Sequence, residues 1–120
     1  MQDLDWYTHY TLDGSPLRLK DQTLHIVDLD GIYVIYRAGT LSLPPRVVRI
    51  GQGNIGACMR SHNADVEITI HGDLNVAIAL ELRESIRNGA ERYLSNVYRP
   101  LVGSAFPDVE PIAVSLPLAA

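Results

Sequence analysis

The chain has 120 residues, of which 47% are hydrophobic and 20% are charged, and its formal net charge is -4. These values predict one globular domain with a modest core, and they exclude a disordered chain. The longest apolar run is far too short to span a membrane. The acidic start at residues 1–5 predicts a cytoplasmic protein rather than a secreted one. Cys58 is the only cysteine, which excludes an intrachain disulfide and disfavours a cysteine-based zinc site.

Charge is distributed unevenly along the chain. Residues 1–30 hold six aspartates against Arg18 and Lys20, whereas residues 31–120 hold eight arginines and eight acidic residues. The first part therefore disfavours contact with a polyanion, while the second part is neutral. Arginine suits bidentate contacts with phosphate, but a general preference for arginine over lysine would give the same composition.

The N-terminal region contains local structure signals but no chemical motif. An aromatic-rich segment at residues 1–12 precedes a turn signal at residues 13–16. Residues 17–20 are predicted to form the return strand of a hairpin. Residues 24–29 are a short apolar segment.

Two strands separated by a loop are predicted next. Residues 31–37, with the sequence Gly-Ile-Tyr-Val-Ile-Tyr-Arg, are rich in β-branched and aromatic side chains and give the strongest strand signal in the chain. Residues 39–45 are predicted to form a loop closed by two prolines, and residues 46–50 a second strand. The Gly-Gln-Gly at residues 51–53 is interpreted as a turn.

A helix is predicted after this turn, because Asn54 can cap its N-terminus and the segment can continue as a helix to about His62. Residues 65–71 show only a weak alternation of polar and apolar side chains. A glycine turn then precedes the third predicted strand, at residues 74–82.

The clearest helix is predicted at residues 84–98. Its apolar side chains recur with a 3.6-residue period, and Pro100 ends it. Gly89 weakens this helix by about 1 kcal/mol relative to alanine. The tail at residues 109–116 is predicted to add one extended segment. The apolar stripe of the helix consists of Ile86, Ala90, Tyr93, Leu94 and Val97.

Four of these segments, taken in order, resemble the GIY-YIG nuclease family. The Gly-Ile-Tyr at residues 31–33 reproduces the first signature, and the Arg-Ile-Gly at residues 49–51 stands where the second belongs. Residues 54–62 resemble the helix that follows. Glu91, with a leucine three residues and a proline nine residues further on, resembles the family's Glu-x-x-Leu-x-x-x-x-x-Pro helix.

The resemblance implies an α+β fold in which a small, mainly antiparallel sheet is flanked by helices. It covers residues 30–103, which we interpret as the core of a single domain. Residues 1–29 are then an N-terminal extension, and residues 104–120 are a C-terminal tail.

The resemblance also implies an active site. In the family, two tyrosines, an arginine and a glutamate converge on one face of the sheet. Hydrolysis of a phosphodiester needs a nucleophile, a Lewis acid and a cation for the developing charge. Carried over, Tyr33, His62 and Glu91 are the expected catalytic residues, and Glu91 is the expected ligand of Mg²⁺ or Mn²⁺.

This sequence departs from the family pattern at three positions. Arg49 replaces the second tyrosine, Cys58 replaces the helix arginine, and Gly103 replaces an asparagine that often follows the proline. The loop between the two signatures is also longer than usual. Arg60 lies about 200° around the helix from Cys58, so it substitutes poorly for the missing arginine. Because Arg49 belongs to a strand expected to pair with that of Tyr33, we predict that it reaches the site and is catalytic.

Each of these residues also has a structural interpretation. Tyr33 can simply pack on the sheet, Arg49 can be a solvated strand residue, and His62 can be an ordinary histidine near a helix end, favoured by the helix dipole. Glu91 can be an exposed carboxylate that pairs with Arg87 four residues earlier. The sequence leaves both interpretations open.

The predicted function is metal-dependent hydrolysis of phosphodiester bonds in DNA. The alternative is a catalytically impaired domain of the same fold that binds nucleic acid or protein. The replacements at Arg49 and Cys58 favour the alternative, whereas the intact Tyr33 and Glu91 favour the nuclease. DNA binding is expected to be weak and independent of sequence, through Arg49 and Arg60, with no membrane partner. The oligomeric state stays open.

Overall fold

The protein is built on a three-stranded antiparallel sheet with the strand order β2-β1-β3. The strands are β1 (Asp30–Arg37), β2 (Arg46–Asn54) and β3 (Leu74–Leu80). The computed structural model describes residues 1–9, 13–15, 18–24, 28–103 and 106–118 of the chain. The strong strand signal at residues 31–37 is confirmed, and it marks the central strand.

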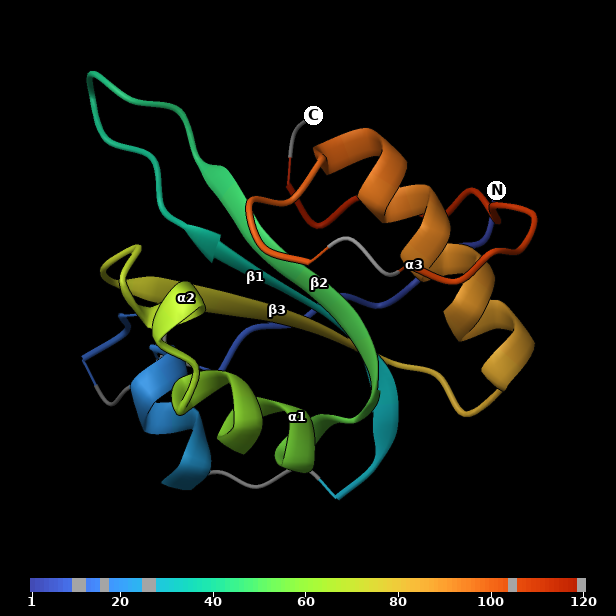
Figure 1. Cartoon of the computed structure of the whole chain (residues 1–120), viewed down its shortest axis with the longest axis horizontal. Helices are drawn as coiled ribbons and strands as arrows, with labels where there is room; N and C mark the ends of the chain where they lie inside the picture. Colours follow the sequence, from blue (N-terminus) through green and yellow to red (C-terminus); the bar gives the residue numbers. More distant parts are fainter. Residues whose placement is uncertain (10–12, 16–17, 25–27, 104–105, 119–120) are drawn as a thin grey trace.

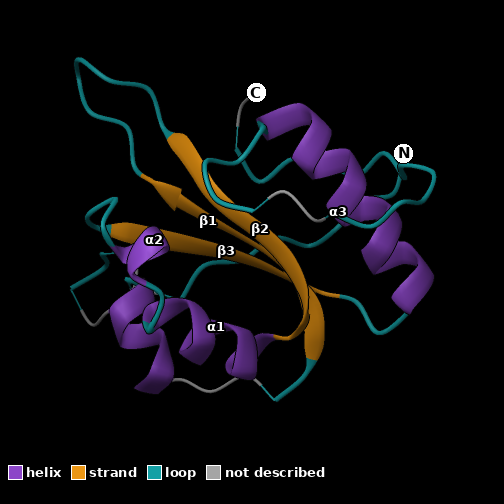
Figure 2. Cartoon of the chain, in the orientation of Figure 1, coloured by secondary structure: helices purple, strands orange, loops and turns teal. Residues whose placement is uncertain are grey.

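Helices cover both faces of the sheet, as Figures 1 and 2 show. The short helix η1 (Leu19–Leu24) lies on one face with α1 (Ile55–Asn63) and α2 (Val66–Thr69), and α3 (Glu84–Tyr98) lies on the other face. The helix predicted at residues 84–98 is confirmed as α3. The predicted α+β class, with an antiparallel sheet between helices, is confirmed.

Local hydrogen bonds explain where the helices begin and end. The Asn54 side chain accepts a hydrogen bond of 3.0 Å from the backbone N–H of Ala57, which confirms the predicted N-terminal cap of α1. The Asp65 carboxylate caps α2 in the same way, accepting from the backbone N–H of Glu67. Helix α3 stops at Arg99, whose φ of 50° is left-handed, directly before Pro100.

Strand β1 separates two hydrophobic clusters because its side chains alternate between the two faces. Tyr33 and Ile35 belong to the cluster under α1, and Ile32 and Val34 belong to the cluster under α3. Burying one such aliphatic side chain contributes about 1.5–3 kcal/mol. The α1 side also contains Leu19, Val48, Ile55, Met59, Ile68, Leu74, Val76 and Ile78, and the α3 side Val47, Ile50, Ala77, Ala90, Leu94, Tyr98 and Val114.

Several expectations about local structure are wrong. Residues 51–53 are not a turn, because β2 continues through them to Asn54 and Gly53 pairs with Gly31. The return strand predicted at residues 17–20 does not form over its described part: Arg18 makes one bridge to Asn75, and η1 begins at the next residue. Residues 16–17 and 25–27 lie outside the described part of the chain.

Two further boundaries also differ from expectation. The weakly alternating segment at residues 65–71 contains the helical turn α2. Strand β3 ends at Leu80, two residues earlier than predicted. The extended tail is represented by one parallel bridge between Gln2 and Val114.

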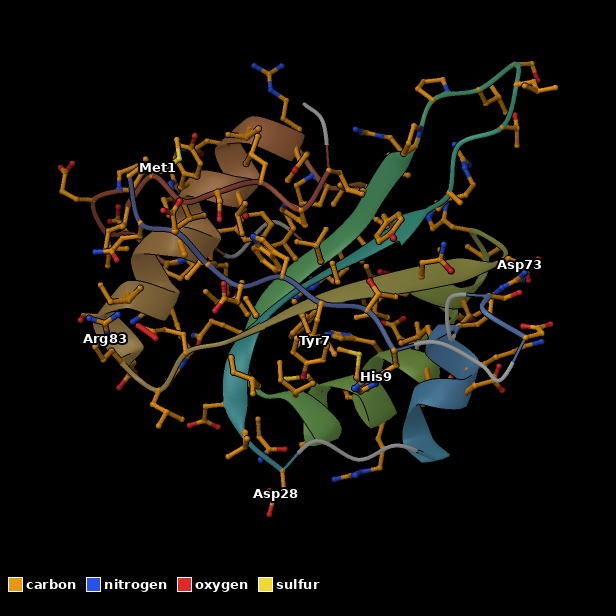
Figure 3. All side chains as sticks on the ribbon, turned by 180° about the vertical axis from the view of Figure 1, so that it is seen from behind. Met1, Tyr7, His9, Asp28, Asp73 and Arg83 are labelled. Carbon is orange, nitrogen blue, oxygen red and sulfur yellow. The ribbon has the colours of Figure 1, made fainter. Side chains whose placement is uncertain are left out.

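The N-terminal segment and the tail are both packed onto the core. Tyr7 and Ile78 exchange two backbone hydrogen bonds of 2.8 and 2.9 Å along the free edge of β3. Figure 3 shows Tyr7 where the N-terminal segment crosses the sheet, with His9 further along towards α1. The Trp6 indole donates a hydrogen bond of 2.8 Å to the carbonyl of Ser115. The Tyr7 bridge pairs backbone groups of Ile78 that the edge strand would otherwise expose.

Candidate functional site

Tyr33 lies at the centre of the candidate site, in the middle of β1. It is opposite Gly51 on β2, and a Cβ at residue 51 would lie 2.2 Å from the tyrosine oxygen, so only glycine leaves room for the ring. The residue is 3% exposed. Its hydroxyl and Nε2 of His62 form a hydrogen bond, and the two rings are tilted by 55° with centroids 5.3 Å apart.

Burial sets the protonation states of this pair. It raises the pKa of Tyr33, and the charges of Cys58 and Glu91 raise it further, whereas Arg49 opposes the shift. Burial lowers the pKa of His62, and the Arg49 cation lowers it further. The pair is therefore a protonated phenol and a neutral imidazole at pH 7, in which Nε2 of the imidazole can accept the phenolic hydrogen.

Arg49 is the cation of the site. It lies on β2 opposite Ile35, two residues before Gly51 and hence on the same face of the strand. The side chain is half-buried, and its Nε is buried without a hydrogen-bond partner among the described residues. Its charge lowers the pKa of four neighbours: Tyr33, Cys58, His62 and Glu91. The expectation that Arg49 reaches the site agrees with this geometry.

Glu91 comes to the site from α3, the helix on the other face of the sheet. It is 8% exposed. Burial raises its pKa to about 7, although the nearby Arg49 acts in the opposite direction. The structural interpretation of Glu91 as an exposed carboxylate paired with Arg87 is wrong. Arg87 donates instead to the Gln52 side chain and to backbone carbonyls.

Helix α1 presents Cys58 and His62 to the site and turns Arg60 away from it. Cys58 is half-buried, and its Sγ lies 4.0 Å from the carbonyl of Gln52. Burial raises the pKa of this thiol, so it is not an activated nucleophile. Arg60 is exposed. Its role in binding substrate stays a prediction.

We call these five residues the Tyr33 cluster: Tyr33, Arg49, Cys58, His62 and Glu91. They come from β1, β2, α1 and α3. Each influences at least one of the others through charge or a hydrogen bond. All four residues predicted to be catalytic are in this cluster.

The cluster can offer a metal ion one carboxylate. Among the described residues, no group of three or more histidine, cysteine, aspartate or glutamate side chains could hold a metal. Mg²⁺ commonly binds through one or two carboxylates and completes its shell with water and substrate phosphate. Glu91 fits that single-carboxylate role, and the donor set does not fit a site built from protein ligands alone.

Gly103, in the sequence only a departure from the family pattern, also lies at the site. Leu101 and Val102 donate backbone hydrogen bonds to the carbonyls of Val47 and Val48, so the segment after α3 runs beside β2. This register brings Gly103 next to Arg49. The sequence shows a glycine three residues after Pro100, but no neighbouring residue indicates that this glycine contacts Arg49.

Comparison with known proteins leaves the assignment to the geometry. The chain matches none of the family models, curated proteins or solved structures with which it was compared. Within the described part of the chain, no helix is both long and apolar enough to cross a membrane.

Proposed function

We propose that the Tyr33 cluster hydrolyses phosphodiester bonds in DNA, as the resemblance to GIY-YIG nucleases implies. One observation carries the proposal. The tyrosine, arginine, histidine and glutamate selected from sequence motifs come together from four separate elements around the charge of Arg49. Perturbed pKa values grouped in this way are typical of functional sites.

Tyr33 and His62 are suited to activating water. The neutral imidazole can accept the phenolic proton at Nε2 while the phenolic oxygen takes a proton from the attacking water. The resulting hydroxide forms a bond to phosphorus as the bond to the leaving oxygen breaks. His62 then returns its proton to solvent, and the leaving oxygen takes up a proton from solvent. General base catalysis of this kind contributes roughly 10²- to 10⁴-fold.

Arg49 is placed to stabilise the charge that develops on the phosphoryl oxygens. The side chain is half-buried and its Nε is already out of water, so an anion that contacts the exposed part of the guanidinium gains charge-assisted hydrogen bonds at a reduced desolvation cost. Interactions that strengthen only in the transition state raise turnover more than binding.

Glu91 would hold Mg²⁺ or Mn²⁺, which supplies Lewis-acid stabilisation when bound. Its carboxylate must be ionised for this role. Since its pKa lies near 7, the fraction able to act increases as pH rises through neutrality.

A second candidate, a binding module without catalysis, is favoured by one specific observation. Tyr33 is only 3% exposed and packs within the hydrophobic cluster under α1. A hydroxyl that never meets water cannot activate it. In that case the Tyr33 cluster would be a structural remnant without catalytic activity, beside a surface that contacts nucleic acid or protein.

A plasmid-nicking assay tests the proposal. The wild type, Tyr33→Phe and Tyr93→Phe are incubated with supercoiled DNA and Mg²⁺ or Mn²⁺. Tyr93 is the matched control, because it lies on α3 against the other hydrophobic cluster. We expect nicking by the wild type and by Tyr93→Phe, and a loss of roughly 10²-fold or more for Tyr33→Phe. A folded wild type that binds DNA without nicking it would favour the second candidate.

A further inference from the structure

Arg49 and Gly103 meet at the free edge of β2, where the chain leaving α3 runs alongside the strand. Backbone hydrogen bonds from Leu101 to Val47 (3.3 Å) and from Val102 to Val48 (2.8 Å) set the register. The next pair in this register is Gly103 with Arg49. Backbone pairing therefore sets the position of residue 103, whatever side chain stands there.

The guanidinium occupies the space that any side chain at residue 103 would need. A Cβ on Gly103 would lie 2.2 Å from Nη1 of Arg49 and 2.9 Å from its Cζ. Neither atom can tolerate that distance, so alanine at residue 103 must displace the guanidinium or the backbone.

The Arg49 side chain is half-buried, but one of its donors makes no hydrogen bond to any described residue. Its Nε has no hydrogen-bond partner in the described part of the chain. Steric fit around the guanidinium, including the space at residue 103, therefore contributes to its orientation. The position of the Arg49 charge therefore depends on the space at Gly103.

We propose that Gly103 is the positioning residue for Arg49: the absence of a side chain at residue 103 seats the guanidinium beside Tyr33, His62 and Glu91. The catalytic consequence rests on the proposed function, but the steric relation does not. Because one cation acts on every other member of the Tyr33 cluster, the identity of residue 103 sets the electrostatics of the whole site.

The chain offers a matched control for backbone strain. Gly103 has a φ of 98° and Gly72 a φ of 96°, a region that disfavours any side chain. A Cβ on Gly72 would meet no heavy atom within 4 Å. Alanine at residue 72 therefore reproduces the strain of alanine at residue 103 without the collision with Arg49.

The position of the guanidinium can be read from His62. The groups that act on its imidazole are Tyr33 on β1, Arg49 on β2 and Asp65 beyond the end of α1. NMR titration of the histidine ring protons would follow the pKa of His62 in the wild type and in four variants, with the other three histidines as internal references. The variants are Gly72→Ala, Gly103→Ala, Arg49→Ala and the double variant Arg49→Ala/Gly103→Ala.

We expect Arg49→Ala to raise the pKa of His62, because it removes a nearby positive charge. Gly103→Ala should raise it in the same direction, while Gly72→Ala leaves it at the wild-type value. The double variant should match Arg49→Ala. An unchanged His62 pKa in Gly103→Ala would overturn the proposal, as would a further rise in the double variant.

Urea unfolding of the same variants gives a second, independent test. Gly103→Ala should lose more stability than Gly72→Ala, and the excess should disappear in the Arg49→Ala background, where the collision is relieved. If Gly103→Ala fails to fold, the double variant should fold. An excess loss that persists without Arg49 would overturn the proposal. If both tests give the expected results while no protein nicks plasmid, the positioning role stands and the proposed nuclease function fails.

Discussion

Two arginines on opposite sides of β2 show how differently the same side chain can be used. Arg87 is 7% exposed, and both its Nε and its Nη1 donate hydrogen bonds to protein acceptors. It donates a hydrogen bond of 2.9 Å to the Gln52 side chain, and hydrogen bonds of 3.0 and 2.8 Å to the carbonyls of Glu81 and Leu82. Arg49 is half-buried, and its Nε has no partner among the residues described.

The difference favours a structural role for Arg87 and supports the chemical role proposed for Arg49. Arg87 uses Nε and Nη1 to join α3 to the Gln52 side chain on β2 and to the carbonyls of Glu81 and Leu82. A buried donor without a partner is unusual in native proteins, and Nε of Arg49 has none within the described part of the chain. We therefore expect mutation of Arg87 to lower stability and mutation of Arg49 to lower activity.

The largest expected effect is on the activity of Arg49→Ala. Removing a cation that stabilises transition-state charge should lower the rate of plasmid nicking by roughly 10²- to 10³-fold. Its free energy of unfolding should change by less than about 1 kcal/mol, because no hydrogen bond to Nε is lost. A large loss of stability with nicking retained would reverse the distinction between the two arginines.

The next effect in size is the loss of stability in Arg87→Met. Methionine keeps the apolar stem but leaves the carbonyls of Glu81 and Leu82 and the Gln52 side chain without their donor. We expect a loss of about 3 kcal/mol in urea unfolding. Arg92→Met on the same helix is the control and should change stability by less than about 0.5 kcal/mol. Equal losses for the two variants would show that the Arg87 hydrogen bonds contribute little.

A smaller effect is expected from the pH dependence contributed by Glu91. Its pKa is raised from 4.5 to about 7 in the folded state, so the folded protein binds more protons than the unfolded chain between these values. Glu91 therefore lowers stability as pH rises from 4.5 to 7, and the penalty is complete above pH 7. Allowing for partial solvent screening, we expect a penalty on the order of 2 kcal/mol.

Glu91→Gln should remove this pH dependence and be more stable, relative to the wild type, at pH 8 than at pH 4. Glu84→Gln, at an exposed position of the same helix, is the control. The measurement is the urea midpoint of each protein across that pH range. A wild type whose stability rises from pH 5 to pH 7 more steeply than that of Glu91→Gln would contradict the assignment.

The smallest effect concerns weak DNA binding. We expect dissociation constants of roughly 10⁻⁴ to 10⁻⁶ M, with affinity falling as salt increases. Arg60→Ala removes an exposed cation outside the cluster and should lower the salt slope by at most about 1 without affecting nicking. Fluorescence anisotropy at several salt concentrations measures the slope. Tight binding that does not respond to salt would contradict a phosphate-based contact.

Elements with strong local signals were predictable from the sequence. The β-branched and aromatic run at residues 31–37 forms β1, the Asn54 cap starts α1, and the 3.6-residue period up to Pro100 forms α3. These signals act between near neighbours in the chain. The same motifs also selected Tyr33, His62 and Glu91, because their spacing resembled a family pattern.

Tertiary structure decided what depends on distant residues. Gly53 continues a strand because Gly31 pairs with it, and the strand predicted beside Arg18 gives way to η1. The burial of Glu91 follows from where α3 packs on the sheet, and no local pattern distinguishes it from an exposed helix carboxylate. Gly103 meets Arg49 only because the chain after α3 returns along β2. Local sequence therefore determined β1, α1, α3 and the residue types of the candidate site, whereas long-range packing determined the remaining elements, the charge states and the fit around Arg49.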